Sequence, residues 1–553
     1  MSFEFKLIEK TLGQVFDETV AKYPNNEALM YVDSKIRWTW GELGEFVDSL
    51  ARGFMALGVE RGDKLALWSV NVHPWEEAML AIAKTGSMLV PVNTGYREKE
   101  LEYLLSHSDA TTLLVGDTFR DFNFLECFCK AVPEIKELTG EKRGTLKCER
   151  FPFLKRVIFM GENAPDFAYS VAEVIELGQQ VSAADYKARQ ASVKPVDIVN
   201  IQYTSGTTGN PKGVMLSHLN VVNDGYWCGR MQNLGPTDRI CLTVPFFHNF
   251  GSVAGIICSA CHASALVVIS SGNPAQIMSV IQEGCTSFYG VPAMYHAILH
   301  HRLFEKIDFS CLRTGIMGGS ICPTPLMEAV IKKMHMPEIT IAYGLTESSP
   351  TMTMTSYLDD MHHRTTSGGR ALPGTEVRII DPHSGREMPQ GEWGEICCRG
   401  FNVMMGYYKN PAATAEAIDK NGFLHSGDLG YLDKEGYVTV SGRIKDLIIR
   451  AGENVYPREI EEFVSKMPGV KDVQVVSVPS RRYGEEVGAF IVPQPEVRLT
   501  REDVRNYCKG QIAWYKVPRY VSFVESFPLN PSGKVQKFKL REMAAELFPN
   551  AMK

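Results

Sequence analysis

Little in this sequence of 553 residues points to nucleic acid or to a membrane surface. The formal net charge is only −6, the pI is near 6.2, and no strongly basic run is present. Such a balance gives no electrostatic reason to expect binding to nucleic acid or to anionic lipids.

A long hydrophobic run is also missing. The most apolar stretch, 253–269, is interrupted by Ser259, His262 and Ser264, whereas a membrane-spanning helix needs about 20 apolar residues. We therefore expect a buried core segment there and no stable insertion into a membrane. Residues 1–24 carry charges throughout, unlike the apolar core of a secretory signal, which favours a cytoplasmic protein.

The thirteen cysteines lack the regular spacing of a disulfide-rich secreted domain. Cys258, Cys261 and His262 match the C-x-x-C-H pattern of covalent haem attachment. They lie inside the apolar stretch, however, and no second cysteine pair stands at the spacing of a zinc site. We therefore interpret these residues as part of the core.

What is present is the composition of a globular protein, with 44% hydrophobic and 22% charged residues. In the first half, strand-like runs alternate with amphipathic helical runs, which is typical of stacked α/β units with mostly parallel sheets. A helix is expected at 73–86, ended by Gly86. The expected strands span 64–70, 86–93, 111–117 and 156–162.

From about residue 365 the pattern changes to short strands separated by Gly-, Asp- and Pro-containing turns, which indicates an antiparallel or barrel-like section. A small α+β pattern follows after Arg443. The sequence therefore predicts an α/β protein with a large N-terminal domain, 1–444, made of stacked α/β subdomains and a β-rich barrel-like subdomain. A small mobile α+β domain, 445–553, completes the chain.

Segment 203–213, YTSGTTGNPKG, is dense in hydroxyl residues and glycine. Its backbone N–H groups and hydroxyls could converge on phosphate oxygens, and Lys212 would add a point charge. It is not a P-loop, because proline precedes Lys212 and glycine follows it. A strand-like run, 197–202, precedes the segment, and Ser217 is expected to cap a helix directly after it.

This segment resembles the phosphate loop of the adenylate-forming superfamily, which contains acyl-CoA synthetases, firefly luciferase and the adenylation domains of peptide synthetases. The resemblance covers essentially the whole chain and is greatest to medium- or long-chain fatty acyl-CoA synthetases. Four further motifs resemble family signatures in the same order: 343–350 (YGLTESSP), 425–443 (from HSGDLGY to SGR), 450–457 (RAGENVYP) and 530–534 (NPSGK).

The resemblance implies a magnesium-dependent adenylation site in which Glu347 binds the metal ion and Asp428 accepts hydrogen bonds from the ribose. The implied catalytic residues are Lys212, His248, Thr346, Glu347 and Lys534. The implied ATP- and AMP-binding residues are Thr204, Ser205, Gly206, Thr207, Thr208, Gly209, Lys212, Gly319, Ser320, Ala342, Tyr343, Gly344, Thr346, Asp428, Arg443 and Lys534.

The resemblance also implies two steps. The ionised acid attacks the α-phosphorus of ATP to give acyl-AMP, and coenzyme A then displaces AMP. Lys445 is the implied hinge of the C-terminal domain. One pose inserts Lys534 for adenylation, and the other brings the CoA-binding residues to the thiol channel. These CoA-binding residues are Ala451, Gly452 and Glu453.

The acid pocket is predicted to be apolar, because no acidic or basic residue interrupts the aromatic segment around His248. A medium-chain fatty acid is the first expectation, and an aromatic or alicyclic acid is the alternative. For each lining residue, ordinary core packing is an equally good interpretation. The predicted acyl-binding residues are His248, Asn249, Phe250, Gly251, Val291 and Gly318.

Three other functions stay open at this point. An enzyme that loads a carrier protein is one, although the aspartate that amino-acid-adenylating relatives place within 246–248 is missing. A luciferase-like oxygenase would share the fold, and a non-catalytic nucleotide sensor would have lost charged groups that are present here. The expected partners are the acid, ATP and CoA, without nucleic acid, and a homodimer is one option.

Overall fold

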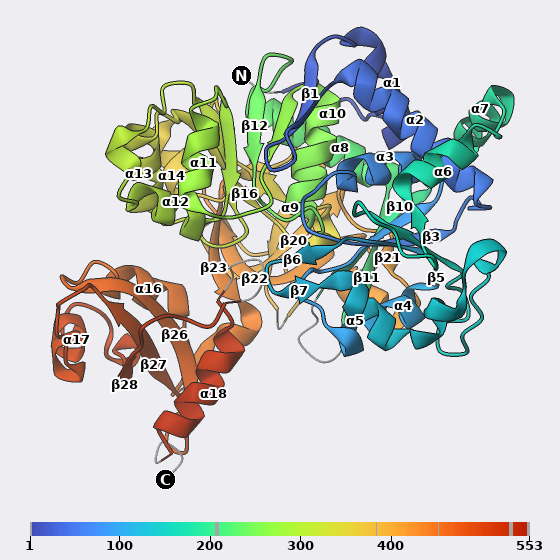
Figure 1. Ribbon diagram of the computed structural model, residues 1–553. Helices are drawn as coiled ribbons and strands as arrows, with labels where there is room; N and C mark the ends of the chain where they lie inside the picture. Colours follow the sequence, from blue (N-terminus) through green and yellow to red (C-terminus); the bar gives the residue numbers. More distant parts are fainter. Residues whose placement is uncertain (1–2, 205–209, 383, 452, 530–534, 550–553) are drawn as a thin grey trace. The chain divides into compact units, whose positions relative to one another are not determined.

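The computed structural model describes residues 3–204, 210–382, 384–451, 453–529 and 535–549 (Figure 1). It divides into two compact units: Met1–Val377 with Cys398–Leu424, and Arg378–Cys397 with His425–Lys553. No helix in the described part of the chain is long and apolar enough to cross a membrane. The predicted α/β fold class is confirmed, whereas the boundary between residues 444 and 445 stays a prediction.

The first unit contains an eight-stranded sheet in the order β21-β11-β10-β4-β3-β5-β8-β9. The strands predicted around 64–70, 86–93, 111–117 and 156–162 are confirmed as β3, β4, β5 and β8, which run parallel. Helices α4 (Glu98–Ser108) and α5 (Phe124–Ala131) pack their apolar side chains on this sheet. Its strands are β3 (Lys64–Trp68), β4 (Met88–Pro91), β5 (Ala110–Val115), β8 (Arg156–Phe159), β9 (Tyr169–Ser170), β10 (Ile198–Thr204), β11 (Lys212–Ser217) and β21 (Gly406–Tyr407).

Helix α3 (Trp75–Thr85) joins β3 to β4 and is buried along its whole length. Glu76 and Glu77 stand in its first turn, where the helix dipole favours negative charge. Gly86 ends the helix in a left-handed conformation with φ of 72°, as predicted. The other helices that precede β10 are α1 (Leu12–Lys22), α2 (Trp40–Ala56), α6 (Val171–Gly178) and α7 (Ala183–Ser192).

A nine-stranded sheet, also in the first unit, has the order β18-β17-β16-β15-β14-β12-β13-β1-β2. The neighbours from β16 to β1 are parallel. Helices α11 (Pro274–Ile281), α12 (Pro292–Leu299) and α13 (Thr324–Lys333) pack on it. Its strands are β1 (Glu27–Tyr31), β2 (Ile36–Thr39), β12 (Arg239–Leu242), β13 (Ala265–Val268), β14 (Ser287–Gly290), β15 (Thr314–Gly318), β16 (Glu338–Tyr343), β17 (Thr353–Met354) and β18 (Arg370–Ala371).

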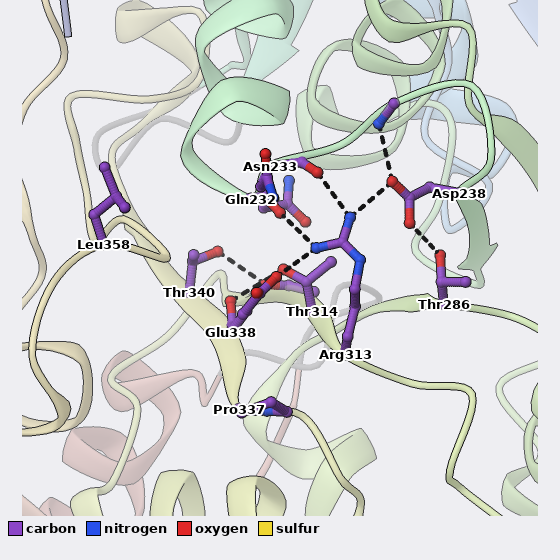
Figure 2. A network of polar contacts seen from close by, with 12 residues as sticks. Gln232, Asn233, Asp238, Thr286, Arg313, Thr314, Pro337, Glu338, Thr340 and Leu358 are labelled. Atoms are coloured by element: carbon purple, nitrogen blue, oxygen red, sulfur yellow. Dashed lines mark hydrogen bonds and ion pairs between the residues drawn. The ribbon is translucent and has the colours of Figure 1, made fainter.

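Arg313 ties together the amino ends of the parallel strands in this sheet (Figure 2). Its guanidinium donates to Asp238 Oδ2 at 2.7 Å and to the carbonyl oxygen of Asn233 at 2.7 Å, and it pairs with Glu338. Asp238 in turn accepts a hydrogen bond of 2.7 Å from Thr286 Oγ1. The polar network fixes the amino edge, so the opposite, carboxyl edge is the one left for ligands.

The structure corrects one expectation about segment 203–213. The segment joins β10 to β11, two antiparallel strands, and does not lead directly into a helix. Residues from Lys212 onward form a strand because Val214 and Leu216 are buried at the two-residue period. Helix α8 (His218–Met231) follows, and Ser217 caps it as predicted, its Oγ accepting from the Asn220 backbone N at 3.2 Å.

The C-x-x-C-H residues form α10 (Cys258–His262). Cys258 is fully buried, and Nε2 of His262 lies 2.8 Å from the carbonyl oxygen of Tyr226. These contacts agree with the interpretation of this segment as core.

The second unit contains most of a four-stranded sheet, in the order β19-β20-β22-β23, and all of a five-stranded sheet. Helices α16 (Pro457–Val464) and α17 (Arg501–Cys508) share one core with the five-stranded sheet, and α18 (Lys537–Leu547) shares another. The short strands and the α+β pattern predicted for this region are confirmed. The strands are β19 (Thr375–Ile380), β20 (Gly394–Gly400), β22 (Leu424–Leu432), β23 (Val438–Arg443), β24 (Ile448–Arg450), β25 (Glu453–Val455), β26 (Val470–Ser480), β27 (Gly484–Pro493) and β28 (Tyr520–Phe523).

Candidate active site

The carboxyl edge of the nine-stranded sheet gathers several predicted residues. β14 ends just before Val291, β15 ends at Gly318, and β16 ends with Ala342 and Tyr343. Gly318 and Ala342 are register partners, and a Cβ on Gly318 would lie 3.1 Å from the Ala342 carbonyl oxygen. Because open α/β sheets bind ligands at this edge, the fold brings the predicted acyl and adenine contacts together.

Two glycines shape the chain beside this edge. Gly319 has a left-handed φ of 81°, and Ser320 after it is exposed. At Gly344 a Cβ would lie 2.0 Å from the carbonyl oxygen of Pro350. Only glycine allows this close approach of two backbone segments, so Gly344 determines the path from Tyr343 to the next motif residues.

Glu347 lies in the one-turn helix η5 (Thr346–Ser348), and its partner is Tyr407. Tyr407 Oη donates to Glu347 Oε1 at 2.7 Å, while Nζ of Lys212 lies 4.9 Å from the centroid of the Tyr407 ring, a cation–π contact. Burial and the neighbouring carboxylate raise the pKa of Tyr407, which keeps its hydroxyl a donor at neutral pH. Tyr407 therefore connects the predicted phosphate-binding lysine to the predicted magnesium ligand.

Thr204 and Lys212, which flank the undescribed part of the phosphate segment, are register partners on the antiparallel strands β10 and β11. Next to Thr204, the Tyr203 hydroxyl lies 2.7 Å from Nδ1 of His107, which fixes the end of β10. The remaining predicted phosphate contacts lie outside the described residues, and their role stays a prediction. They are Ser205, Gly206, Thr207, Thr208 and Gly209.

A buried carboxylate on α8 anchors the segment that follows η5. Asp224 is fully buried and accepts a hydrogen bond of 3.0 Å from the Thr351 backbone N. Asn402 Nδ2 donates to the carbonyl oxygen of Thr351 at 2.9 Å. Burial raises the pKa of Asp224 to about 7. The motif that carries Thr346 and Glu347 is thus attached to a group that titrates near neutral pH.

The predicted acyl-binding segment forms one compact turn around α9 (Asn249–Gly251). His248 caps this turn, with Nδ1 accepting from the Phe250 backbone N at 3.2 Å. The Phe250 ring stacks on Tyr289 with centroids 6.0 Å apart. A Cβ on Gly251 would lie 2.3 Å from the Pro245 carbonyl oxygen, so the turn also depends on a glycine. Contact of these residues with an acid stays a prediction.

The predicted ribose-binding pair lies in the second unit. Asp428 on β22 and Arg443 on β23 are register partners, with Oδ1 of the carboxylate 3.6 Å from Nε of the guanidinium. Glu395 holds the turn before Asp428, because it accepts from the Gly427 backbone N at 2.9 Å and lies 2.8 Å from His425 Nδ1. The structure therefore brings Asp428 and Arg443 together on a fixed turn.

Glu395 is also part of a cluster with metal-ligand chemistry. Its carboxylate, the Cys397 thiol and the His425 imidazole place one ligand atom each within 4.8 Å of one another. The hydrogen bonds of Glu395 to His425 and Gly427 already account for this arrangement. We therefore assign the cluster to support of the turn.

The residues predicted for the hinge and for CoA follow β23. Lys445 lies in η6 (Ile444–Asp446), where burial and the nearby Arg443 lower the pKa of its ammonium. Ala451 has a left-handed φ of 56°, and Glu453 is exposed at the start of β25. Gly452 and Lys534 lie outside the described residues. The roles of all five stay predictions.

Tyr407, Asp224 and Glu395 were not found from the sequence. Tyr407 reaches Glu347 only because β21 pairs with β11, with Gly406 opposite Met215. No local pattern around Tyr407 signals such a contact between distant segments.

The chain matches the family of AMP-binding enzymes over residues 16–408 and the AMP-binding enzyme C-terminal domain over 459–534. YngI of Bacillus subtilis (strain 168), provisionally named an acyl-CoA synthetase, is 43% identical over 98% of this chain and 98% of its own length. The mitochondrial medium-chain acyl-CoA ligase ACSF2 of Rattus norvegicus is 37% identical over 97% of this chain and 88% of its own. The crystal structure of ATP-bound MatB from Rhodopseudomonas palustris is 26% identical, with a TM-score of 0.83 over 98% of this chain and 100% of that chain. This chain belongs to the AMP-binding enzyme family.

Proposed function

We propose that this protein is an AMP-forming acyl-CoA synthetase that converts an apolar carboxylate, ATP and CoA into acyl-CoA, AMP and pyrophosphate. The observation that carries the proposal is the group formed by Lys212, Tyr407 and Glu347. In it, Tyr407 contacts both the lysine that we assign to phosphate and the carboxylate that we assign to a divalent ion. The names of the relatives support CoA as the acceptor.

In the first step, an oxygen of the ionised acid forms a bond to the α-phosphorus, and the bond from that phosphorus to pyrophosphate breaks. No general base is needed, because the acid is already ionised at neutral pH. Catalysis then consists of aligning the two reactants and neutralising charge on the leaving pyrophosphate. Lys212 and Lys534 supply positive charge, and Thr346 donates to the α-phosphate.

Glu347 fits Mg²⁺, which prefers hard carboxylate oxygens and keeps waters and substrate phosphates as its other ligands. Its Oε1 is already oriented by the hydrogen bond from Tyr407. When bound, the ion would withdraw charge from the phosphate oxygens.

In the second step, the CoA sulfur attacks the acyl carbonyl carbon and AMP leaves. We assign the domains to residues 1–444 and 445–553, with Lys445 as the hinge between the adenylating and thioester-forming poses. Ala451, Gly452 and Glu453 then line the approach of the thiol. We further propose a medium-chain fatty acid as the substrate, which the name of ACSF2 supports, with an aromatic or alicyclic acid as the alternative. We also propose a cytoplasmic location, and a homodimer is one option for the oligomeric state.

The test is release of AMP from ATP by the purified protein with Mg²⁺, CoA and a series of straight-chain, aromatic and alicyclic acids. AMP release that needs both CoA and an apolar acid supports the proposal. Release that needs a carrier protein in place of CoA would contradict the assigned acceptor.

A further inference from the structure

Residues 243–248 lead from β12 to His248, and the other sheet of the same unit holds this segment by side-chain hydrogen bonds. Asn71 follows β3 at its carboxyl end and is only 6% exposed. Its Oδ1 accepts from the Phe246 backbone N at 2.8 Å, and its Nδ2 donates to the Val244 carbonyl oxygen at 2.9 Å. One buried amide thus satisfies both a donor and an acceptor of the segment, as a neighbouring strand would.

Gln202 on β10 makes the next contact along the same segment. It is 4% exposed, and its Nε2 donates to the Phe247 carbonyl oxygen. Gln202 and Thr204 lie two positions apart, so their side chains leave the same face of β10. The strand that ends at Thr204, where the predicted phosphate segment begins, therefore also holds the residue directly before His248.

Apolar packing also holds this segment. The rings of Trp75 and Phe246 are both fully buried with centroids 5.2 Å apart. The His248 backbone N donates to the Pro245 carbonyl oxygen at 3.1 Å, which closes the turn. Three polar backbone groups of the segment are bound by Asn71 and Gln202, and displacing it would leave them unpaired in a buried place.

We propose that Asn71 and Gln202 are positioning residues of the acid site: they fix His248 relative to the carboxyl ends of β3 and β10 and so set both acid selectivity and the alignment of acid with ATP. The inference rests on the proposed function and on the prediction from the sequence that His248 contacts the acid. A displacement of about 1 Å in such a site can cost about 100-fold in rate. Neither residue needs to touch either substrate.

The experiment compares Asn71→Ala, Asn71→Ser and Gln202→Ala with the wild type. KM and kcat are measured separately for ATP and for acids from butyrate to decanoate. Asn71→Ser keeps a small uncharged hydroxyl that can accept from the Phe246 backbone N or donate to the Val244 carbonyl oxygen, so it serves as the partial rescue. It also gives the readout if Asn71→Ala does not fold.

A matched control comes from the partly buried polar network at the other edge of the nine-stranded sheet. Arg313→Lys weakens contacts with Asp238 and Glu338 (Figure 2). It should lower the Tm without changing acid selectivity, because Arg313 lies at the amino ends of the strands.

We expect Asn71→Ala and Gln202→Ala to raise the KM for the preferred acid about 10-fold and to flatten the chain-length profile. The KM for ATP should change less than twofold in Asn71→Ala. The acid KM of Asn71→Ser should lie between that of Asn71→Ala and that of the wild type. Two results would overturn the positioning role alone, provided that the wild type is active. In the first, the acid KM and the chain-length profile stay unchanged in these variants; in the second, they change equally in Arg313→Lys. A wild type that forms no AMP with any acid overturns the proposed function and this role with it.

Discussion

Tyr407 donates a hydrogen bond of 2.7 Å to Oε1 of Glu347. The same ring lies 4.9 Å from Nζ of Lys212. A single aromatic side chain thus orients the carboxylate assigned to magnesium and makes a cation–π contact with the lysine assigned to phosphate. Because a hydrogen bond to a charged group is worth about 1.5–3 kcal/mol, removing it should have a measurable effect on adenylation.

Tyr407→Phe keeps the ring and loses the hydroxyl. We expect about a 10-fold lower kcat/KM for adenylation and a higher Mg²⁺ requirement, measured by acid-dependent pyrophosphate exchange over a range of Mg²⁺ concentrations. The adjacent Tyr408→Phe is the control, because the Tyr408 hydroxyl donates to Asp109 at 2.8 Å instead. Equal Mg²⁺ requirements in the two variants would contradict the assignment of Glu347.

Lys534→Ala should abolish acyl-AMP formation, with a loss of about 10²–10³ in rate for one preorganised charge. It should leave thioester formation from supplied acyl-AMP largely intact. Pyrophosphate exchange measures the first reaction and thioester release the second. Lys539→Ala, an exposed lysine of α18, is the control and should leave both unchanged. Equal damage to the two half-reactions by Lys534→Ala would argue against a swinging domain.

Gly452→Trp should have the opposite effect on the two half-reactions, sparing acyl-AMP formation and blocking thioester formation. The bulky ring would obstruct the approach of CoA, so pyrophosphate exchange persists while transfer to CoA is blocked. Its neighbours are Ala451, with a left-handed φ of 56°, and the exposed Glu453. Collapse of pyrophosphate exchange in a variant with an unchanged Tm would show that this loop also serves the first step.

Asp224 should make stability depend on pH. Burial raises its pKa to about 7 in the folded protein, whereas an unfolded Asp titrates near 3.9. The folded state then binds the proton more tightly than the unfolded state. The stabilisation of the fold by this proton is therefore fully present below pH ~4 and is lost as pH rises through about 7. The other groups around this carboxylate are the Thr351 backbone N and the buried Cys228 and Cys258.

Asp224→Asn removes this titration and retains an acceptor for the Thr351 backbone N. The Tm of the variant minus that of the wild type, measured from pH 5 to 8.5, should therefore increase with pH. Parallel Tm profiles over this range would mean that Asp224 does not titrate in it.

The sequence predicted the elements whose signal is local. Strands such as 64–70 read as apolar runs because parallel strands are buried on both faces, and Gly86 ended its helix at the expected place. One motif predicted both Asp428 and Arg443 as nucleotide contacts, and the structure shows that they are register partners. The sequence did not predict strand β11, which begins at Lys212, because this strand is short and starts within the polar segment.

Contacts between distant segments could not be predicted in this way. Asn71 meets Phe246, and Tyr407 meets Glu347, only after two sheets have formed and packed. Periodicity and turn chemistry describe neighbours along the chain, and they carry no information about which far residue will lie opposite. The residues that support the site from distant segments, such as Asn71 and Tyr407, could therefore be identified only from the structure.

The most direct test of the central claim is kcat/KM for CoA-dependent AMP release with acids from acetate to decanoate, with benzoate and cyclohexane carboxylate alongside. An apolar pocket predicts a gain of about fourfold per added methylene until the pocket is full, because burying one methylene is worth ~0.8 kcal/mol. A preference for acetate, or for an acid with a second charged group, would contradict the account.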